Sequence, residues 1–177
     1  NGINNETKAR ALMALAFIDH VVLDADALTV FENNPEELFI DCYPHTILTP
    51  HEGEFKKIFG NEIAEIDDRV LKTKEASIKS NTTVVLKGAN TIIASPSGDV
   101  VINKSSATYL ATAGSGDVLA GIITSLVGKN KMNAFDAACA GVWLHSEIGT
   151  ILGAGMIAED IIDLIPVTVK KLLKMYQ

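Results

Sequence analysis

The sequence predicts an α/β fold in which a mostly parallel sheet lies between two layers of helices. Short apolar runs rich in β-branched residues recur along the chain, as in "VVL", "TILT" and "TTVVL". Helical stretches separate these runs, and each run ends in polar residues. Continuous apolar strands that alternate with helices are typical of a parallel sheet covered on both faces.

The first half of the chain supplies most of the predicted sheet. A helix is expected over residues 5–18, where apolar residues recur at helical spacing, and the strand of "HVVLDADAL" follows it. The next strand, 46–49, leads through Pro50 into a helix that should stop near Gly60. A polar helix from about 66 to 80 then precedes the strand of "TTVVLKGANT".

The second half of the chain breaks this alternation. "TIIASPSGDVVIN" contains two short strands around a Pro-Ser-Gly turn, which predicts a small antiparallel hairpin. The C-terminal part is then expected to be helical over about 114–128, 133–152 and 157–175. Pro166 should kink or split the last of these helices, because proline removes a backbone donor.

Composition excludes several classes of function. The 22 acidic and 15 basic residues give a net charge of −7 without a basic stripe, which argues against nucleic acid or an anionic membrane as a partner. No apolar run approaches the ~18 residues of a membrane span, and no secretory signal is visible, so a cytoplasmic location is expected. Cys42 and Cys139 form no C-x-x-C motif and are expected to be buried, reduced thiols.

The candidate site lies at the carboxyl ends of the predicted strands, where ligands bind in open α/β sheets. "DAD" (24–26), "TPHEGE" (49–54) and "KGANT" (87–91) fall on this rim, and the glycine-rich turn "AGSGD" (113–117) can join them. The turn is neither a Walker A loop nor a dinucleotide fingerprint, because the required lysine and third glycine are missing. It predicts a helix N-terminus whose free amides bind an anion.

Asp117 stands directly beside this predicted anion site. One hypothesis makes it a base that accepts a hydroxyl proton during phosphoryl transfer, while the amides stabilise the developing charge. The alternative is that Asp117 only occupies the first helical turn, where acidic residues are favoured anyway. The turn alone does not decide between the two.

Five motifs in one order carry a family resemblance: "LDADAL", "ILTPHEGEF", "VVLKGANTIIASPSGDVVIN", "LATAGSGDVLAGII" and "AGVWLHSEIG". Together they resemble the ADP/ATP-dependent NAD(P)H-hydrate dehydratase family, which has a ribokinase-like three-layer α/β/α fold. The resemblance implies a lyase of nicotinamide cofactor repair. It would dehydrate the S epimer of NADH or NADPH hydrate, consume ADP or ATP with Mg²⁺, and release AMP or ADP with phosphate.

The resemblance also implies roles for individual residues. Asp117 would be the catalytic base in contact with the hydrated ring, and the turn at Gly114 and Gly116 would hold a nucleotide phosphate. The segment that matches the family's adenine-nucleotide segment consists of Lys87, Gly88, Ala89, Asn90 and Thr91, with Lys87 as a charge on phosphate. The alternative for Lys87 is a solvated lysine at the end of a strand.

Three further positions are implied to take part. His51 matches a substrate-contacting histidine, although a lone histidine is more often an ordinary hydrogen-bonded residue. Glu54 would organise Mg²⁺ through water, or would simply be a first-turn glutamate favoured by the helix dipole. Gly2 would be the last glycine of a substrate-binding Gly-Pro-Gly loop. His145 resembles a family position, for which a structural role is expected.

The sequence departs from the family pattern in three places. The loop 103–113 lacks the customary glycine ahead of "AGSGD", and Glu52 replaces the proline that usually follows His51. The chain starts at Asn1, so residues 1–177 are expected to be the C-terminal portion of one ribokinase-like domain whose first part lies upstream. Such a piece should expose an unpaired sheet edge and fold poorly alone. The resemblance implies a homo-oligomer and, in some relatives, an upstream epimerase domain.

Two other functions remain open at the level of sequence. A ribokinase-like kinase that acts on a vitamin precursor alcohol would use the same aspartate, glycine turn and lysine, although such relatives favour Asn where His51 stands. A non-catalytic remnant that binds nucleotide would fit the altered loop and the absent first half.

Overall fold

The computed structural model describes residues 2–104 and 108–175. Their five strands are β1 (Val22–Leu23), β2 (Ile47–Leu48), β3 (Thr83–Leu86), β4 (Asn90–Ala94) and β5 (Val100–Lys104). They form one sheet in the order β1-β2-β3-β4-β5. The pairs β1–β2 and β2–β3 are parallel, whereas β3–β4 and β4–β5 are antiparallel. The predicted hairpin is therefore confirmed, and it joins the parallel part through a second tight turn.

The helices agree closely with the sequence pattern. They are α1 (Asn5–Phe17), α2 (Asp26–Thr29), α3 (Pro35–Ile40), α4 (Glu52–Ala64), α5 (Arg69–Ser80), α6 (Ser115–Gly128), α7 (Ala134–Leu152) and α8 (Ala158–Met175), with a 3₁₀ turn, η1 (Thr108–Leu110). The long helices begin within about three residues of their expected positions. The two short helices, α2 and α3, were not predicted, because elements of one or two turns show little periodicity.

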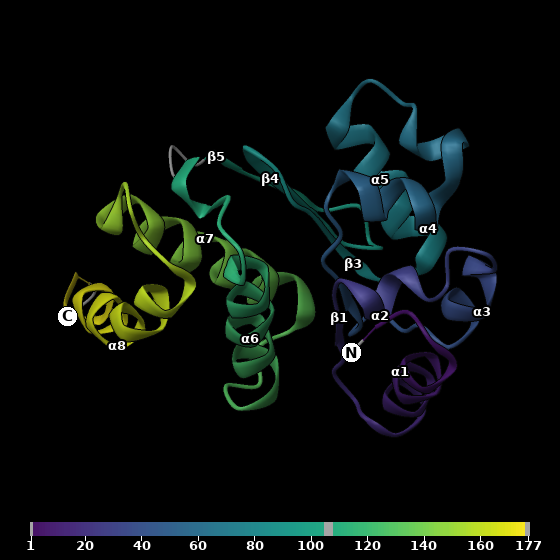
Figure 1. The fold of residues 1–177 in the computed structure, drawn as a ribbon, viewed down its shortest axis with the longest axis horizontal. Coiled ribbons are helices and arrows are strands. Elements are labelled where there is room, and N and C mark those ends of the chain that lie inside the picture. The colour runs from purple at the N-terminus through teal and green to yellow at the C-terminus, as the bar shows by residue number, and fades with distance from the viewer. Residues whose placement is uncertain (1, 105–107, 176–177) are drawn as a thin grey trace.

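The sheet separates two helical layers (Figure 1). Helices α4 and α5 lie on one side of it, and α6 and α7 lie on the other. Helix α8 packs against α6 and α7 on the outside, next to the C-terminus. The three-layer α/β/α architecture expected from the sequence is confirmed.

Alternate strand residues supply the two cores. Leu48 and Val84 pack with Phe55 of α4 on one face of the sheet. Ile47 and Val85 point to the opposite face and pack with residues of α6 and α7. Because successive strand side chains point to opposite faces, an apolar run of a few residues is enough to anchor both helical layers.

Two helix-breaking residues were expected to interrupt helices, with different outcomes. Helix α8 runs through Pro166 as one element, so of the predicted kink or split, the split is not found. The stop predicted near Gly60 is confirmed, because Gly60, with a φ of 71° and a ψ of 174°, breaks the helical geometry. A second short helical stretch then follows it to Ala64 within α4.

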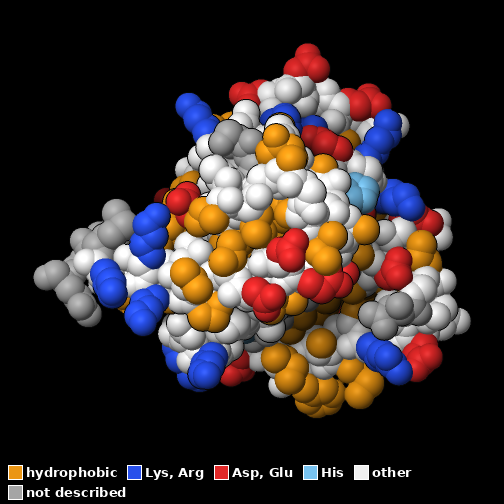
Figure 2. Space-filling view, turned by 60° about the vertical axis from the view of Figure 1, so that its left-hand side comes forward, with side chains coloured by type: hydrophobic (Ala, Val, Ile, Leu, Met, Phe, Trp, Pro, Cys, Tyr) orange, Lys and Arg blue, Asp and Glu red, His pale blue; other side chains and the backbone are white. Residues whose placement is uncertain are grey.

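The surface carries no element that would span a bilayer: none of the described helices is both long and apolar enough. Figure 2 shows hydrophobic side chains distributed over the face that comes forward, with acidic groups among them. Exposed residues on α8 include Ile162, Val167 and Leu173. Cys42 is buried, as expected, and burial raises the pKa of its thiol to about 12, whereas Cys139, which was also expected to be buried, is only half-buried.

Candidate active site at the carboxyl ends of the strands

The site begins where the parallel strands end. Lys87 directly follows β3, and its amide donates to the carbonyl of Pro50 at 2.9 Å. Lys87 and His51 also form a parallel β-bridge beyond the named strands. Asp24 follows β1 in the same way. The parallel register therefore brings three polar residues, far apart in the sequence, to one edge of the sheet.

Lys87 lies between two carboxylates. Its Nζ is 2.7 Å from Oδ1 of Asp24 and 3.9 Å from Oε2 of Glu54. The side chains of Lys87, Asp24 and Glu54 are only 21%, 12% and 10% exposed. Charges at this depth are screened less than surface charges, so this ammonium group is held in a defined position. The alternative of a solvated lysine is not what the structure shows.

His51 and Glu54 form a capping box at the start of α4. Nδ1 of His51 accepts hydrogen bonds from the amides of Gly53 at 2.9 Å and Glu54 at 3.2 Å. Oε2 of Glu54 accepts from the amide of His51 at 2.9 Å. An accepting Nδ1 places the proton of neutral His51 on Nε2, which lies 3.3 Å from Oε1 of Glu54. Both residues therefore have a structural role, which is to cap the start of α4.

The N-terminus of α6 is open. Side chains cap four other helices, namely those of Asn4, His51, Asp68 and Asn133. Within the described part of the chain, no side chain caps α6, whose N-cap is Gly114 with a φ of 81°. The first intrahelical bond is donated by Val118, so the amides of Gly116 and Asp117 have no acceptor inside the helix. This end of the helix can receive an anion.

Gly116 brings the open turn against the lysine. A Cβ atom on Gly116 would lie 3.5 Å from Nζ of Lys87 and 3.6 Å from Oδ2 of Asp24. The glycine-rich turn and the strand ends thus meet, as the sequence predicted. Asp117 occupies the first turn of α6 and is exposed, so its carboxylate is not buried in the protein interior.

A pocket of about 480 Å³ opens between these elements. Its polar wall includes His51, Lys87, Thr91, Thr108, Ser115, His145 and Ser146, together with the small residues Gly88, Ala89 and Gly116. Its apolar wall includes Leu110 of η1, Leu119 of α6 and Val142 of α7. A polar end beside an apolar recess is typical of sites that hold a ring with a charged tail.

His145 supports the open turn through its contacts with Ser115. Its Nε2 lies 3.0 Å from both the hydroxyl and the carbonyl oxygen of Ser115, the first residue of α6. Burial lowers the pKa of His145 to about 4, against a smaller opposing effect of the hydrogen bond to the Ser115 backbone. The imidazole is therefore neutral near pH 7, and its geometry fits the structural role expected for it.

The structure brings together most of the predicted nucleotide residues. Those that line the pocket are Lys87, Gly88, Ala89, Thr91 and Gly116, whereas Asn90 does not line it. His51, which was predicted to contact the substrate, lines the same pocket. Gly114 and Asp117 belong to the same turn but do not line this cavity, and Glu54 lies behind Lys87. Gly2 is placed elsewhere, with its amide on Oδ2 of Asp26 at 2.8 Å. Residues 105–107 of the altered loop lie outside the described residues.

Sequence reasoning missed several residues of this site. Asp24 was placed on the rim of the site but given no role, yet it is the closest charged partner of Lys87. Arg69, which received no role, donates to the carbonyl of Asn90 at 2.6 Å. The position of Asp24 immediately after a predicted strand was a usable signal, since Lys87 was found by the same rule. No local pattern marks Arg69, because its partners are about 20 residues away.

The carboxylates of the site are suited to a magnesium ion that arrives with phosphate. No three His, Cys, Asp or Glu side chains among residues 2–104 and 108–175 converge as a metal site. Mg²⁺ usually keeps several waters and uses only one or two carboxylates together with substrate phosphates. Asp24 and Glu54, both beside Lys87, meet that requirement.

Sequence relatives point to one family. The family model described as NAD(P)H-hydrate dehydratase matches residues 1–166. An ADP-dependent (S)-NAD(P)H-hydrate dehydratase from Neisseria meningitidis is 41% identical over 150 residues, which are 80% of this chain and 50% of that protein. A bifunctional NAD(P)H-hydrate repair enzyme from Gloeobacter violaceus is 42% identical over 134 residues, 76% of this chain and 26% of that protein. The chain thus spans half or less of these relatives.

Solved structures agree with this assignment. An ADP/ATP-dependent NAD(P)H-hydrate dehydratase from Bacillus subtilis, co-crystallised with ATP/Mg²⁺ and soaked with CoA, is 29% identical with a TM-score of 0.69, and covers 86% of this chain and 56% of that one. A ribokinase-like superfamily protein from Enterococcus faecalis, 24% identical, has a TM-score of 0.80 over 96% of this chain and 60% of its own, and supports the fold alone. With its ribokinase-like architecture and a family match over residues 1–166, the chain belongs to the NAD(P)H-hydrate dehydratase family.

Proposed function

We propose that the protein repairs nicotinamide cofactors as an ADP- or ATP-dependent (S)-NAD(P)H-hydrate dehydratase, a hydro-lyase. The observation that carries this proposal is the open N-terminus of α6 beside Lys87. Backbone donors, a fixed ammonium group and a nearby carboxylate are the parts that phosphoryl transfer to a hydroxyl requires. A dehydration without phosphoryl transfer would leave this arrangement without a purpose.

In this proposal the nucleotide lies in the pocket with its phosphates at the turn. The apolar wall with Leu110, Leu119 and Val142 accommodates the base, and the amides of Gly116 and Asp117 receive a phosphate. Lys87 adds a positive charge on the same group. Mg²⁺, when bound with the nucleotide, would neutralise phosphate charge near Asp24 and Glu54.

Asp117 is the base in this proposal. Its carboxylate accepts the proton of the added hydroxyl as the hydroxyl oxygen bonds to the terminal phosphorus, and the bond from that phosphorus to the nucleotide's bridging oxygen breaks. The nucleotide leaves as AMP from ADP, or as ADP from ATP. Loss of the new phosphate, together with a ring proton, then restores the double bond of NADH or NADPH. The exposed position of Asp117 leaves it accessible to a substrate hydroxyl.

His51 and Gly2 remain proposed substrate contacts. His51 lines the pocket, but Nδ1 is used by the α4 cap, so any contact would be made through Nε2 or the ring. Gly2 lies next to Asp26 at the start of α2, two residues from Asp24. Asn90 contributes its backbone carbonyl, which accepts a hydrogen bond from Arg69.

The test uses the intact protein with hydrated NADH, ADP and Mg²⁺. Recovery of the reduced-nicotinamide absorbance, lost in Asp117→Asn, is the expected result. No recovery in the wild type would refute the dehydratase proposal. Transfer of phosphate to hydroxylated vitamin precursors would instead identify the small-molecule kinase, and nucleotide binding without turnover on any of these substrates would identify the non-catalytic remnant.

We further propose, from the same family membership, that residues 1–177 form the C-terminal portion of one ribokinase-like domain. We expect a cytoplasmic homo-oligomer. As in some relatives, an epimerase domain would lie upstream in the full-length protein. Size-exclusion chromatography with light scattering on the intact protein tests the oligomer.

A further inference from the structure

Arg69 links the two ends of the proposed nucleotide segment. It is the first residue of α5, where Asp68 is the N-cap. Nη1 donates to the carbonyl of Asn90 at 2.6 Å, and Nη2 donates to the carbonyl of Lys87 at 3.4 Å. One planar guanidinium group therefore spans the turn between β3 and β4 and holds its two ends.

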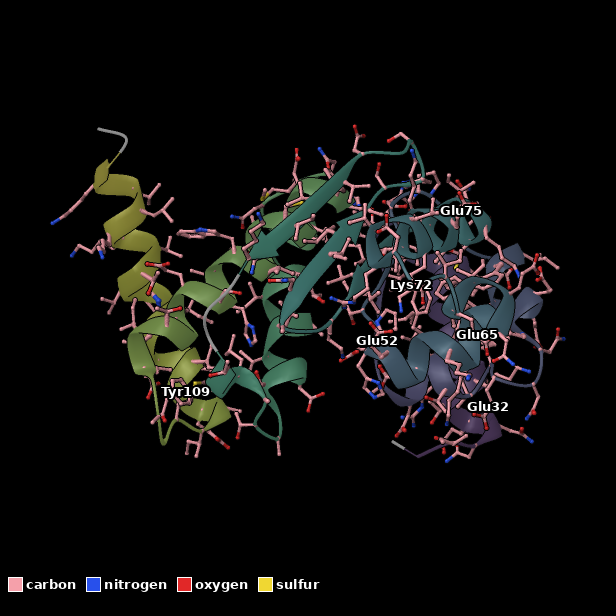
Figure 3. The ribbon with its side chains drawn as sticks, turned by 90° about the horizontal axis from the view of Figure 1, so that it is seen from above. Glu32, Glu52, Glu65, Lys72, Glu75 and Tyr109 are labelled. Carbon is pink, nitrogen blue, oxygen red and sulfur yellow. The ribbon has the colours of Figure 1, made fainter. Side chains whose placement is uncertain are left out.

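Glu52 fixes the orientation of this guanidinium group. Oε1 of Glu52 accepts from Nε of Arg69 at 2.8 Å, and Oε2 accepts from Nζ of Lys72 at the same distance. Figure 3 shows Glu52 and Lys72 side by side where α4 and α5 meet. Partial burial acts to raise the pKa of Glu52, but hydrogen bonds and charges from Lys72 and Arg69 outweigh it and lower the pKa below its usual value. A proline at this position, as the family pattern has, would supply no such carboxylate.

Gly88 provides the room that Arg69 needs. A Cβ atom at this position would lie 2.7 Å from Nη2 and 3.3 Å from Cζ of Arg69. Gly88 does not have a positive φ, so backbone conformation does not account for a glycine here. The close approach of the guanidinium group does account for it.

We propose that Arg69, oriented by Glu52, is a positioning residue that holds the segment from Lys87 to Asn90 in its nucleotide-binding conformation. Gly88 is then required for Arg69 and not for contact with the nucleotide. The inference rests on the proposed function, because it takes this segment as part of a nucleotide site. Fixing the Lys87 carbonyl also fixes the start of the side chain that carries the ammonium group.

The experiment is a double-mutant cycle read by calorimetric binding of ADP to the intact protein. Arg69→Gln is expected to weaken ADP binding about tenfold, because charge-assisted hydrogen bonds to the segment are lost. Gly88→Ala should weaken it by a similar factor, since the new methyl group displaces the guanidinium group. The double variant should bind no more weakly than Arg69→Gln alone. Arg10→Gln, which removes an exposed ion pair in α1, is the matched control and should bind ADP as the wild type does.

Two readouts separate positioning from general stability. Arg69→Lys keeps the charge but cannot span two carbonyls, so its ADP affinity should resemble that of Arg69→Gln. In steady state, KM for ADP should rise while kcat is largely kept, because Arg69 does not touch the reacting atoms. Wild-type affinity in Arg69→Lys, or a loss confined to kcat, would overturn the proposal.

The cycle also distinguishes this inference from the proposed function. If Gly88→Ala weakens ADP binding further in the Arg69→Gln background, Gly88 serves the nucleotide directly and the inference is wrong. If the wild type binds no ADP, the proposed function fails and the positioning role fails with it. Urea unfolding of the same four proteins without nucleotide then still measures whether Arg69 and Gly88 are coupled, and additive effects there would contradict the contact itself.

Discussion

Acidification from about pH 7 to about pH 5 is expected to destabilise the protein through His145. The imidazole is buried against Ser115 at the start of α6. Burial, partly opposed by the hydrogen bond to the Ser115 backbone, lowers its pKa from an ordinary value of 6.5 to about 4. The folded state therefore binds the proton more weakly than the unfolded state does.

The sign and size of the effect follow from these two pKa values. The stabilisation from neutral His145 is fully present above the unfolded pKa of 6.5 and decreases as the pH falls toward about 4. One pKa unit corresponds to about 1.4 kcal/mol, so the full window is worth about 3 kcal/mol. At pH 5 the expected loss is about 2 kcal/mol, a large fraction of the stability of a typical domain.

The assay is urea unfolding of the intact protein at several pH values, for the wild type and for His145→Gln. The glutamine amide can still donate to the Ser115 carbonyl but does not titrate in this range. The difference in unfolding free energy between the two proteins should change by about 1 kcal/mol or more per pH unit between pH 6 and pH 5. Parallel pH profiles for the two proteins would refute the reasoning.

Four other substitutions give further tests. Asp117→Asn should lower turnover by about 10² to 10⁴ in coupled assays while calorimetry still detects ADP binding, as expected for the loss of a general base. Lys87→Ala should weaken ADP binding about tenfold or more, with a reduced dependence on salt, because a charge on phosphate is lost. Gly114→Ala should lower unfolding free energy by about 1 to 2 kcal/mol, since the φ of 81° strains any L side chain. Gly141→Ala places a methyl carbon 2.6 Å from Cγ1 of Ile123 in the core and should lower Tm, measured by thermal unfolding, through about 1 to 3 kcal/mol of overpacking.

Much of the architecture was predictable because it depends on local patterns. Apolar runs such as Val84–Leu86 gave the parallel strands, and the Pro-Ser-Gly turn gave the hairpin from β4 to β5. Pro166 does not split α8, which was one of the two predicted outcomes, since packing of α8 against α6 and α7 compensates for the loss of one backbone hydrogen bond. The short helices α2 and α3 were missed because they are stabilised by burial of residues such as Leu28 and Leu38.

The site was only partly predictable, for a different reason. Lys87, His51 and Gly116 follow the rule that polar residues gather at strand ends, and the pocket does contain them. The partners that orient them are distant in sequence, as in Lys87 with Asp24, 63 residues apart, and Ser115 with His145, 30 residues apart. Such pairs depend on strand order and helix packing, which a single sequence does not reveal. The roles of Asp117 and Gly2 toward a substrate stay predictions.

The residues that line the pocket come from elements on both faces of the sheet. His51 caps α4, which packs on one face of the sheet, and Lys87 follows β3 of the sheet itself, whereas Gly116 and His145 belong to α6 and α7 on the opposite face. The distance between the Lys87 ammonium group and the amides of Gly116 and Asp117 therefore depends on how the two helical layers pack against a sheet with short strands. Repacking a buried aliphatic contact such as that of Ile123 should consequently change nucleotide affinity from a distance, because it changes how the two helical layers are aligned.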